Sequence, residues 1–103
     1  MNRLIQENRA ELEKLCRRYH VRRLELFGSA TGARFDPSRS DLDFLVEFGE
    51  LAFSQYAESY FGLLEGLEAL FQRPIDLVMV SAIKNPYFLE AIASSRAVLY
   101  DAA

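Results

Sequence analysis

Hydrophobic and polar residues follow two different periods along this chain, and each period predicts one kind of element. Residues 2–19 and 54–71 repeat apolar side chains every three or four positions, which predicts two amphipathic helices. Residues 41–48 alternate apolar and polar side chains, which predicts a strand with one buried face. Short apolar runs predict further strands. The four predicted strands are residues 21–27, 41–48, 75–80 and 97–100.

The segments between these runs contain turn signals and more helical pattern. Asp36-Pro37 is typical of a turn, and Pro86 suits the first position of a helix. The predicted connections are a helical turn at 29–33, a loop at 34–40, a turn at 81–85 and a helix at 86–95. Helices and strands then alternate, which predicts an α/β fold: a small mixed sheet flanked by helices, formed as a single domain by residues 1–103.

Composition narrows the class of protein. Half of the 103 residues are apolar, which predicts a globular chain with a core. The net charge of −3 lacks the basic surface that nucleic-acid binding needs, so no direct nucleic-acid partner is expected. Cys16 is the single cysteine, which excludes an internal disulfide, and no apolar stretch approaches the ~20 residues of a membrane span. We therefore expect a cytoplasmic protein that does not bind membranes.

A candidate phosphate-binding turn follows the strand at 21–27. Gly28 has no Cβ, so the backbone can turn sharply there and approach a phosphate. Ser29 offers a hydroxyl and an amide at the start of the predicted helical turn, where a helix attracts anions. A helix N-cap is the structural alternative for Ser29, and it is compatible, because a capping serine can also bind phosphate.

Three aspartates supply candidate metal ligands. Asp41 and Asp43 would share one face of the strand at 41–48, opposite its apolar face, and paired carboxylates suit Mg²⁺ with its bound phosphates. Asp76, inside another apolar run, would complete the site or accept a proton from an attacking hydroxyl. Each acid also has a purely structural alternative. Asp41 and Asp43 could be acids at the start of a strand that cap a loop, and Asp76 could be an acid on an edge strand that faces water. Together with the turn, the acids predict nucleotidyl transfer with release of pyrophosphate.

These residues also carry a family resemblance. The segment LFGSATGARFDPSRSDLDFLVEF (residues 26–48), followed downstream by IDLVMV and KNPYFLEAI, resembles the minimal nucleotidyltransferase (MNT) branch of the DNA polymerase beta superfamily. The resemblance covers nearly the whole chain and implies the polymerase beta-like fold. It also implies metal-binding, catalytic carboxylates at Asp41, Asp43 and Asp76, and triphosphate binding at Gly28 and Ser29.

The resemblance implies a partner as well. Many MNT proteins are antitoxins encoded beside a HEPN-domain toxin, and some transfer AMP from ATP to a tyrosine of that ribonuclease and silence it. We therefore expect Mg²⁺ as cofactor, ATP as substrate and a HEPN toxin in a hetero-oligomer. One alternative is an antitoxin that neutralises the toxin by binding alone. Another is transfer to a small molecule such as an aminoglycoside.

Several other residues have alternative roles. Gly32 stands one place earlier than the corresponding glycine of many relatives, which predicts weaker phosphate binding by the loop. Arg34 and Arg39 are candidates for a phosphate contact or for solvated loop positions. Glu47 is expected to be solvated rather than a fourth ligand, and His20 is given no catalytic role. Most of the following aromatic residues are expected in the core, with one or two on a partner surface: Tyr56, Tyr60, Phe61, Tyr87 and Phe88.

Overall fold

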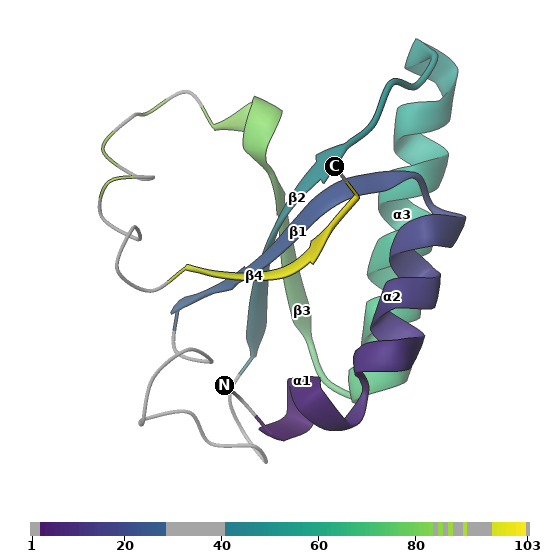
Figure 1. Cartoon of the computed structure of the whole chain (residues 1–103). Helices are drawn as coiled ribbons and strands as arrows, with labels where there is room; N and C mark the ends of the chain where they lie inside the picture. Colours follow the sequence, from purple (N-terminus) through teal and green to yellow (C-terminus); the bar gives the residue numbers. More distant parts are fainter. Residues whose placement is uncertain are drawn as a thin grey trace.

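A four-stranded sheet with helices packed on one face forms the centre of the protein (Figure 1). The computed structural model describes residues 3–28, 41–83, 85, 87, 90 and 96–102. Its elements are α1 (Arg3–Glu7), α2 (Arg9–Arg18), β1 (Val21–Phe27), β2 (Leu42–Phe48), α3 (Phe53–Phe71), β3 (Ile75–Met79), the 3₁₀ helix η2 (Val80–Ala82) and β4 (Ala97–Asp101). None of the helices in these ranges is long and apolar enough to cross a bilayer.

The sheet is mixed, as predicted. Its strands lie in the order β3-β2-β1-β4, and β1 is antiparallel to both β2 and β4. β2 and β3 are parallel, so α3 forms the crossover that connects them. The predicted strand boundaries are correct to within one residue, but β2 begins at Leu42, so Asp41 lies just before the strand and not in it.

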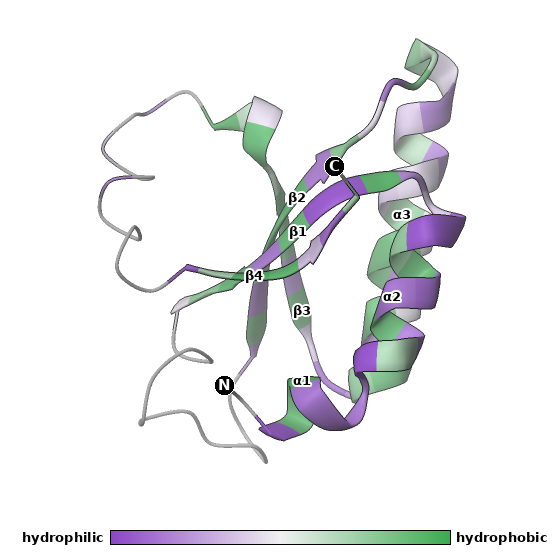
Figure 2. Ribbon diagram, in the orientation of Figure 1, coloured by the Kyte–Doolittle hydropathy of each residue, from purple (hydrophilic) through white to green (hydrophobic). Residues whose placement is uncertain are grey.

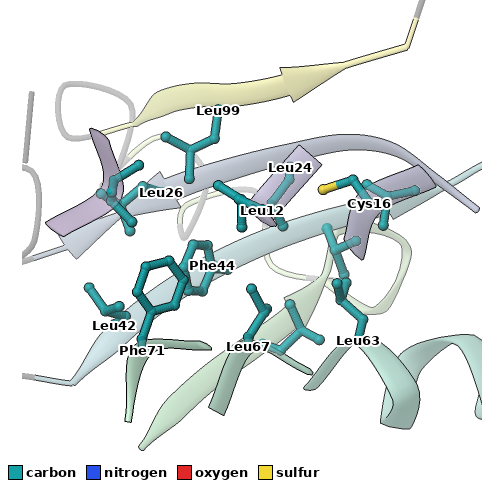
Figure 3. Close-up of a cluster of buried hydrophobic side chains, with 14 of the residues drawn as sticks. Leu12, Cys16, Leu24, Leu26, Leu42, Phe44, Leu63, Leu67, Phe71 and Leu99 are labelled. Atoms are coloured by element: carbon teal, nitrogen blue, oxygen red, sulfur yellow. The ribbon is translucent and has the colours of Figure 1, made fainter. Parts of the chain in front are cut away.

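The alternating pattern of β2 places its apolar side chains between the sheet and the helices. Phe44 and Val46 are buried there with Leu24 and Leu26 of β1. Phe44 stacks on Phe71 at the end of α3, with 6.1 Å between the ring centroids (Figure 3). Hydropathy follows the same division, because the apolar stripes of the helices face the sheet (Figure 2). The sheet's opposite face is thus left to carry charged residues.

The prediction of a single helix over residues 2–19 is wrong, because the helix is interrupted at Asn8 and forms two segments, α1 and α2. The Asn8 side chain donates to the Leu4 carbonyl at 2.9 Å, and its backbone N–H donates to Ile5 at 3.2 Å. Asn8 itself has φ −112° and ψ 14°, outside the helical range. Asparagine competes in this way with the helical backbone, since its short side chain reaches nearby carbonyls. The apolar positions are nevertheless as predicted, with Leu12 and Cys16 fully buried.

Two glycines of α3 let α2 approach closely. A Cβ built on Gly66 would lie 2.6 Å from Cδ2 of Leu15, and one on Gly62 would overlap the Tyr19 ring. Each glycine costs a helix about 1 kcal/mol relative to alanine. Larger side chains at these two positions would push α2 and α3 apart, so glycine here permits the close packing of the two helices. The predicted turn at 29–33, the loop at 34–40 and most of the helix at 86–95 lie outside the described residues.

Candidate active site

The end of β1 and the starts of β2 and β3 lie side by side at one end of the sheet and bring the predicted site residues together. The last residue of β1, Phe27, pairs with Asp43 near the start of the antiparallel strand β2. Asp43 in turn pairs with Asp76 on the parallel strand β3. Partners on neighbouring strands project from the same face of a sheet. Gly28, directly after β1, and Asp41, directly before β2, therefore flank this row.

Gly28 lies against the carboxylate of Asp43. A Cβ on Gly28 would stand 2.7 Å from Oδ2 of Asp43, and the residue has φ +77°, a conformation that L side chains rarely adopt. The positive φ favours glycine at this position, and a Cβ here would displace the Asp43 carboxylate. The sequence predicted close approach of the backbone to a phosphate; the structure adds that the first group which occupies the space beside Gly28 is a carboxylate.

Asp43 is the electrostatic centre of the site. Its side chain is half-buried, whereas Asp41 and Asp76 are exposed. Burial raises the pKa of Asp43 above its usual 3.8, and the negative charges of Asp76 and Asp41 raise it further. Asp43 thus lies close enough to the other two carboxylates to be repelled by both. A bound divalent cation would relieve this repulsion, and oxygen donors of this kind are what Mg²⁺ prefers.

The arrangement of the three aspartates bears on which of them could coordinate a metal ion. Among the described residues, no three Asp, Glu, His or Cys side chains are placed to hold a metal ion together. Within the described residues β3 is the outermost strand next to β2, and Asp76 is exposed, as the alternative of a solvent-facing edge-strand acid predicts. Its pairing with Asp43 nevertheless places it in the same row. The carboxylates that the sheet brings together are those of Asp43 and Asp76, with Asp41 adjacent, and carboxylate oxygens are donors that a magnesium ion accepts.

The raised pKa of Asp43 predicts that the stability of the protein depends on pH. The pKa of Asp43 is 3.8 in the unfolded state and higher in the native state, so the native state binds more protons between these two pKa values. The free energy of unfolding therefore falls as the pH rises from 3.8 through the native pKa. Asp43→Asn should therefore raise the melting temperature of the metal-free protein at pH 7 by a few degrees. The difference should vanish as the pH falls toward 3.8. Thermal denaturation in a chelator measures it, and a lower melting temperature for the variant at pH 7 would contradict the assignment.

A buried ion pair on the same face of the sheet was not predicted from the sequence. Glu25 is 3% exposed. It accepts a hydrogen bond at 2.7 Å from Nε of Arg96 and forms an ion pair at 2.8 Å with Nε of Arg23. These three side chains line a cavity of about 120 Å³. The available signal was a single acid between Leu24 and Leu26 in an apolar strand.

Other predicted residues have structural partners or lie outside the described residues. Glu47 forms an ion pair with Arg22 at 3.3 Å, which supports its assignment as a surface position. The His20 carbonyl accepts a hydrogen bond from the Gly49 N–H at 2.9 Å. The residues of the predicted phosphate loop that lie outside the described ranges are Ser29, Gly32, Arg34 and Arg39.

The aromatic residues divide between the core and the surface. Tyr56 and Tyr60 pack against the core, as predicted. Phe61 is 58% exposed and Tyr87 is 74% exposed, so these two are the surface candidates. Phe53, which the sequence did not single out, is 96% exposed at the start of α3. Phe88 lies outside the described residues.

The chain belongs to the nucleotidyltransferase domain family, whose pattern matches residues 9–99. It is therefore a nucleotidyltransferase, which confirms the predicted enzyme class. A relative in Methanocaldococcus jannaschii, named "putative protein adenylyltransferase", is 37% identical over 76 residues, which are 73% of each chain.

Solved structures confirm the fold. A "putative minimal nucleotidyltransferase" is 28% identical, with a TM-score of 0.70 and coverage of 90% of both chains. A complex of an MNT antitoxin with a tri-AMPylated HEPN toxin from Shewanella oneidensis contains a chain 20% identical, with a TM-score of 0.62. The match covers 93% of this chain and 71% of that one, and at this identity it shows the shared fold alone.

Proposed function

We propose that this protein is a Mg²⁺-dependent adenylyltransferase that transfers AMP from ATP to a hydroxyl group of a HEPN toxin, and that it acts as the antitoxin of that toxin. The observation that carries the proposal is the pairing of Asp43 with Asp76 on parallel strands, beside a glycine whose φ is positive. Two carboxylates in one row, for which no ion pair is found among the described residues, next to backbone with no side chain, suit a cation that carries a triphosphate.

In this proposal each residue has a chemical role. Asp43 and Asp76, with Asp41 adjacent, would hold a divalent cation, which would supply positive charge to balance the triphosphate and the leaving pyrophosphate. Gly28 admits the phosphates to the backbone, and Ser29 donates a hydrogen bond to them. The acceptor hydroxyl oxygen bonds to the α-phosphorus, while the bond from that phosphorus to the bridging oxygen breaks. Besides its place beside the cation, Asp76 also takes the proton of the hydroxyl as the new ester forms.

The acceptor and the partner are inferred from relatives. The name of the Methanocaldococcus relative describes transfer of an adenylyl group to protein. The Shewanella complex pairs a chain of this fold with a HEPN toxin that carries AMP. A tyrosine is the proposed acceptor, because its phenolic hydroxyl can be presented at a protein surface without a carrier domain.

The mass of the partner tests this proposal. A HEPN protein, as the proposed partner, is incubated with this chain, Mg²⁺ and each nucleoside triphosphate in turn, and its mass is then measured by mass spectrometry. We expect an increase of one or more AMP groups with ATP, and peptide mapping should place them on tyrosine. The variant Asp41→Asn/Asp43→Asn should still bind the partner without modifying it.

One observation favours neutralisation by binding alone as a second candidate function. Phe53 and Phe61 of α3 are 96% and 58% exposed, and aromatic residues are enriched at the centres of protein interfaces. The same experiment separates the two functions. A partner that stays unmodified and is still neutralised by the double variant would show that masking is sufficient.

A further inference from the structure

We propose that Tyr60 is a positioning residue for Asp76: its hydroxyl anchors the edge strand β3 to α3 and so keeps Asp76 level with Asp43 for cation binding. This inference rests on the proposed function and deepens it, because it names a residue outside the predicted motif. Tyr60 itself contacts neither the cation nor the nucleotide in this scheme.

The anchor is a single short hydrogen bond. The Tyr60 hydroxyl donates to the carbonyl oxygen of Leu77 at 2.6 Å, and Leu77 directly follows Asp76. Among the described residues β3 pairs with β2 alone, so the backbone groups on its outer side have no strand partner in that part of the chain. The Tyr60 hydroxyl bonds to one of these groups, the carbonyl oxygen of Leu77. Because Leu77 is next to Asp76, a shift of the strand at this point would move Asp76 as well.

The phenol ring is itself held in place. Tyr60 packs against the core and meets Phe61 edge to face, with 5.2 Å between the centroids and 87° between the ring planes. The helix that carries it packs closely on α2, where a Cβ on Gly66 would lie 2.6 Å from Cδ2 of Leu15. The hydroxyl therefore projects from a packed helix, and the bond it makes limits the position of β3.

Tyr60 and Asp76 also interact electrostatically. Burial raises the pKa of Tyr60, and the negative charge of Asp76 raises it further, so the phenol stays protonated and remains a donor at neutral pH. Catalytic groups need placement to within about 1 Å, since larger errors cost about 10²-fold in rate. An unanchored edge strand would not meet that demand.

The test compares two tyrosine variants of the same helix. Tyr60→Phe removes the hydroxyl that bonds to Leu77. Tyr56→Phe removes one a turn earlier, from a ring that packs edge to face on Phe48 at 6.3 Å and that makes no hydrogen bond within the described residues. Mn²⁺ binding to each protein, without nucleotide, is measured by electron paramagnetic resonance. We expect Tyr60→Phe to bind Mn²⁺ about tenfold more weakly, at the low end of the effect of groups that orient metal ligands. Tyr56→Phe should bind it as the wild type does.

A double-mutant cycle with Asp76→Asn distinguishes positioning from general destabilisation. If Tyr60 acts through Asp76, Tyr60→Phe should cause no further loss of Mn²⁺ affinity in the Asp76→Asn background. Transfer by Tyr60→Phe should show a lower kcat with little change in KM for ATP. Equal Mn²⁺ affinity in Tyr60→Phe and wild type, or additive losses in the cycle, would overturn the inference and leave the proposed function intact. A wild-type protein that neither binds Mn²⁺ nor transfers AMP would overturn both.

Discussion

Asp43→Asn should lower the rate of AMP transfer by on the order of 10²–10³-fold, the effect of removing one preorganised group that stabilises transition-state charge. Asp43 is the half-buried member of the acidic row, and it lies between Gly28 and Asp76. Neutralising it removes a ligand and leaves the charge of the phosphates less compensated. The rate is measured as AMP incorporated into the HEPN partner per unit time at saturating Mg²⁺ and ATP.

A second acid on the same strand provides the control. Glu47 also projects from β2 away from the helices, but it forms an ion pair with Arg22 at 3.3 Å and lies far along the strand from Gly28. Glu47→Gln removes the same charge and should retain transfer within about twofold, because exposed ion pairs contribute little. Similar losses in both variants would mean that net charge, and not the position of Asp43, governs the reaction.

Gly28→Ala should abolish most transfer and also reduce stability. The new Cβ would lie 2.7 Å from Oδ2 of Asp43, and φ +77° costs an L residue roughly 1–2 kcal/mol. The carboxylate must move away, which disturbs the row of acids. In a domain of this size such a cost corresponds to a fall of roughly 4–16 °C in melting temperature. Calorimetry and the transfer assay measure the two effects separately.

Gly49 and Asp43 supply the controls for that variant. A Cβ on Gly49 would meet only the His20 carbonyl, at an ordinary distance of 3.6 Å, so Gly49→Ala should change little. In an Asp43→Ala background the steric part of the Gly28→Ala penalty should disappear, while the backbone part should remain. If Gly28→Ala transfers AMP at the wild-type rate, the close packing of glycine and carboxylate has no role in the reaction.

Periodicity predicted most of the fold because burial on one face leaves a direct trace in the sequence. The alternation in β2 and the helical stripe of α3 both correspond to buried side chains. The break at Asn8 left no such trace. The apolar stripe continues through it, and the deciding hydrogen bond to Leu4 depends on a side-chain conformation that no pattern records.

The site was predictable where its residues are close along the chain, and less so where they are not. Gly28, Asp41 and Asp43 belong to one motif. Whether Asp76 lies beside Asp43 depends on the register of β3 against β2, which only the packed sheet determines. Glu25 finds Arg96 at a separation of 71 residues, and Tyr60 finds Leu77 at a separation of 17. Contacts of that kind follow from topology and cannot be read from local sequence.

The parallel pairing of β2 and β3 links ligand binding to the lifetime of the protein. Asp43 and Asp76 become neighbours only when the whole crossover through α3 has closed, so an unfolded chain holds no such pair. Any ligand that bridges them therefore binds the native state alone and stabilises it by mass action, by about 2.7 kcal/mol at one hundred times its dissociation constant. Proteases that attack the opened crossover would then meet fewer susceptible molecules as that ligand accumulates.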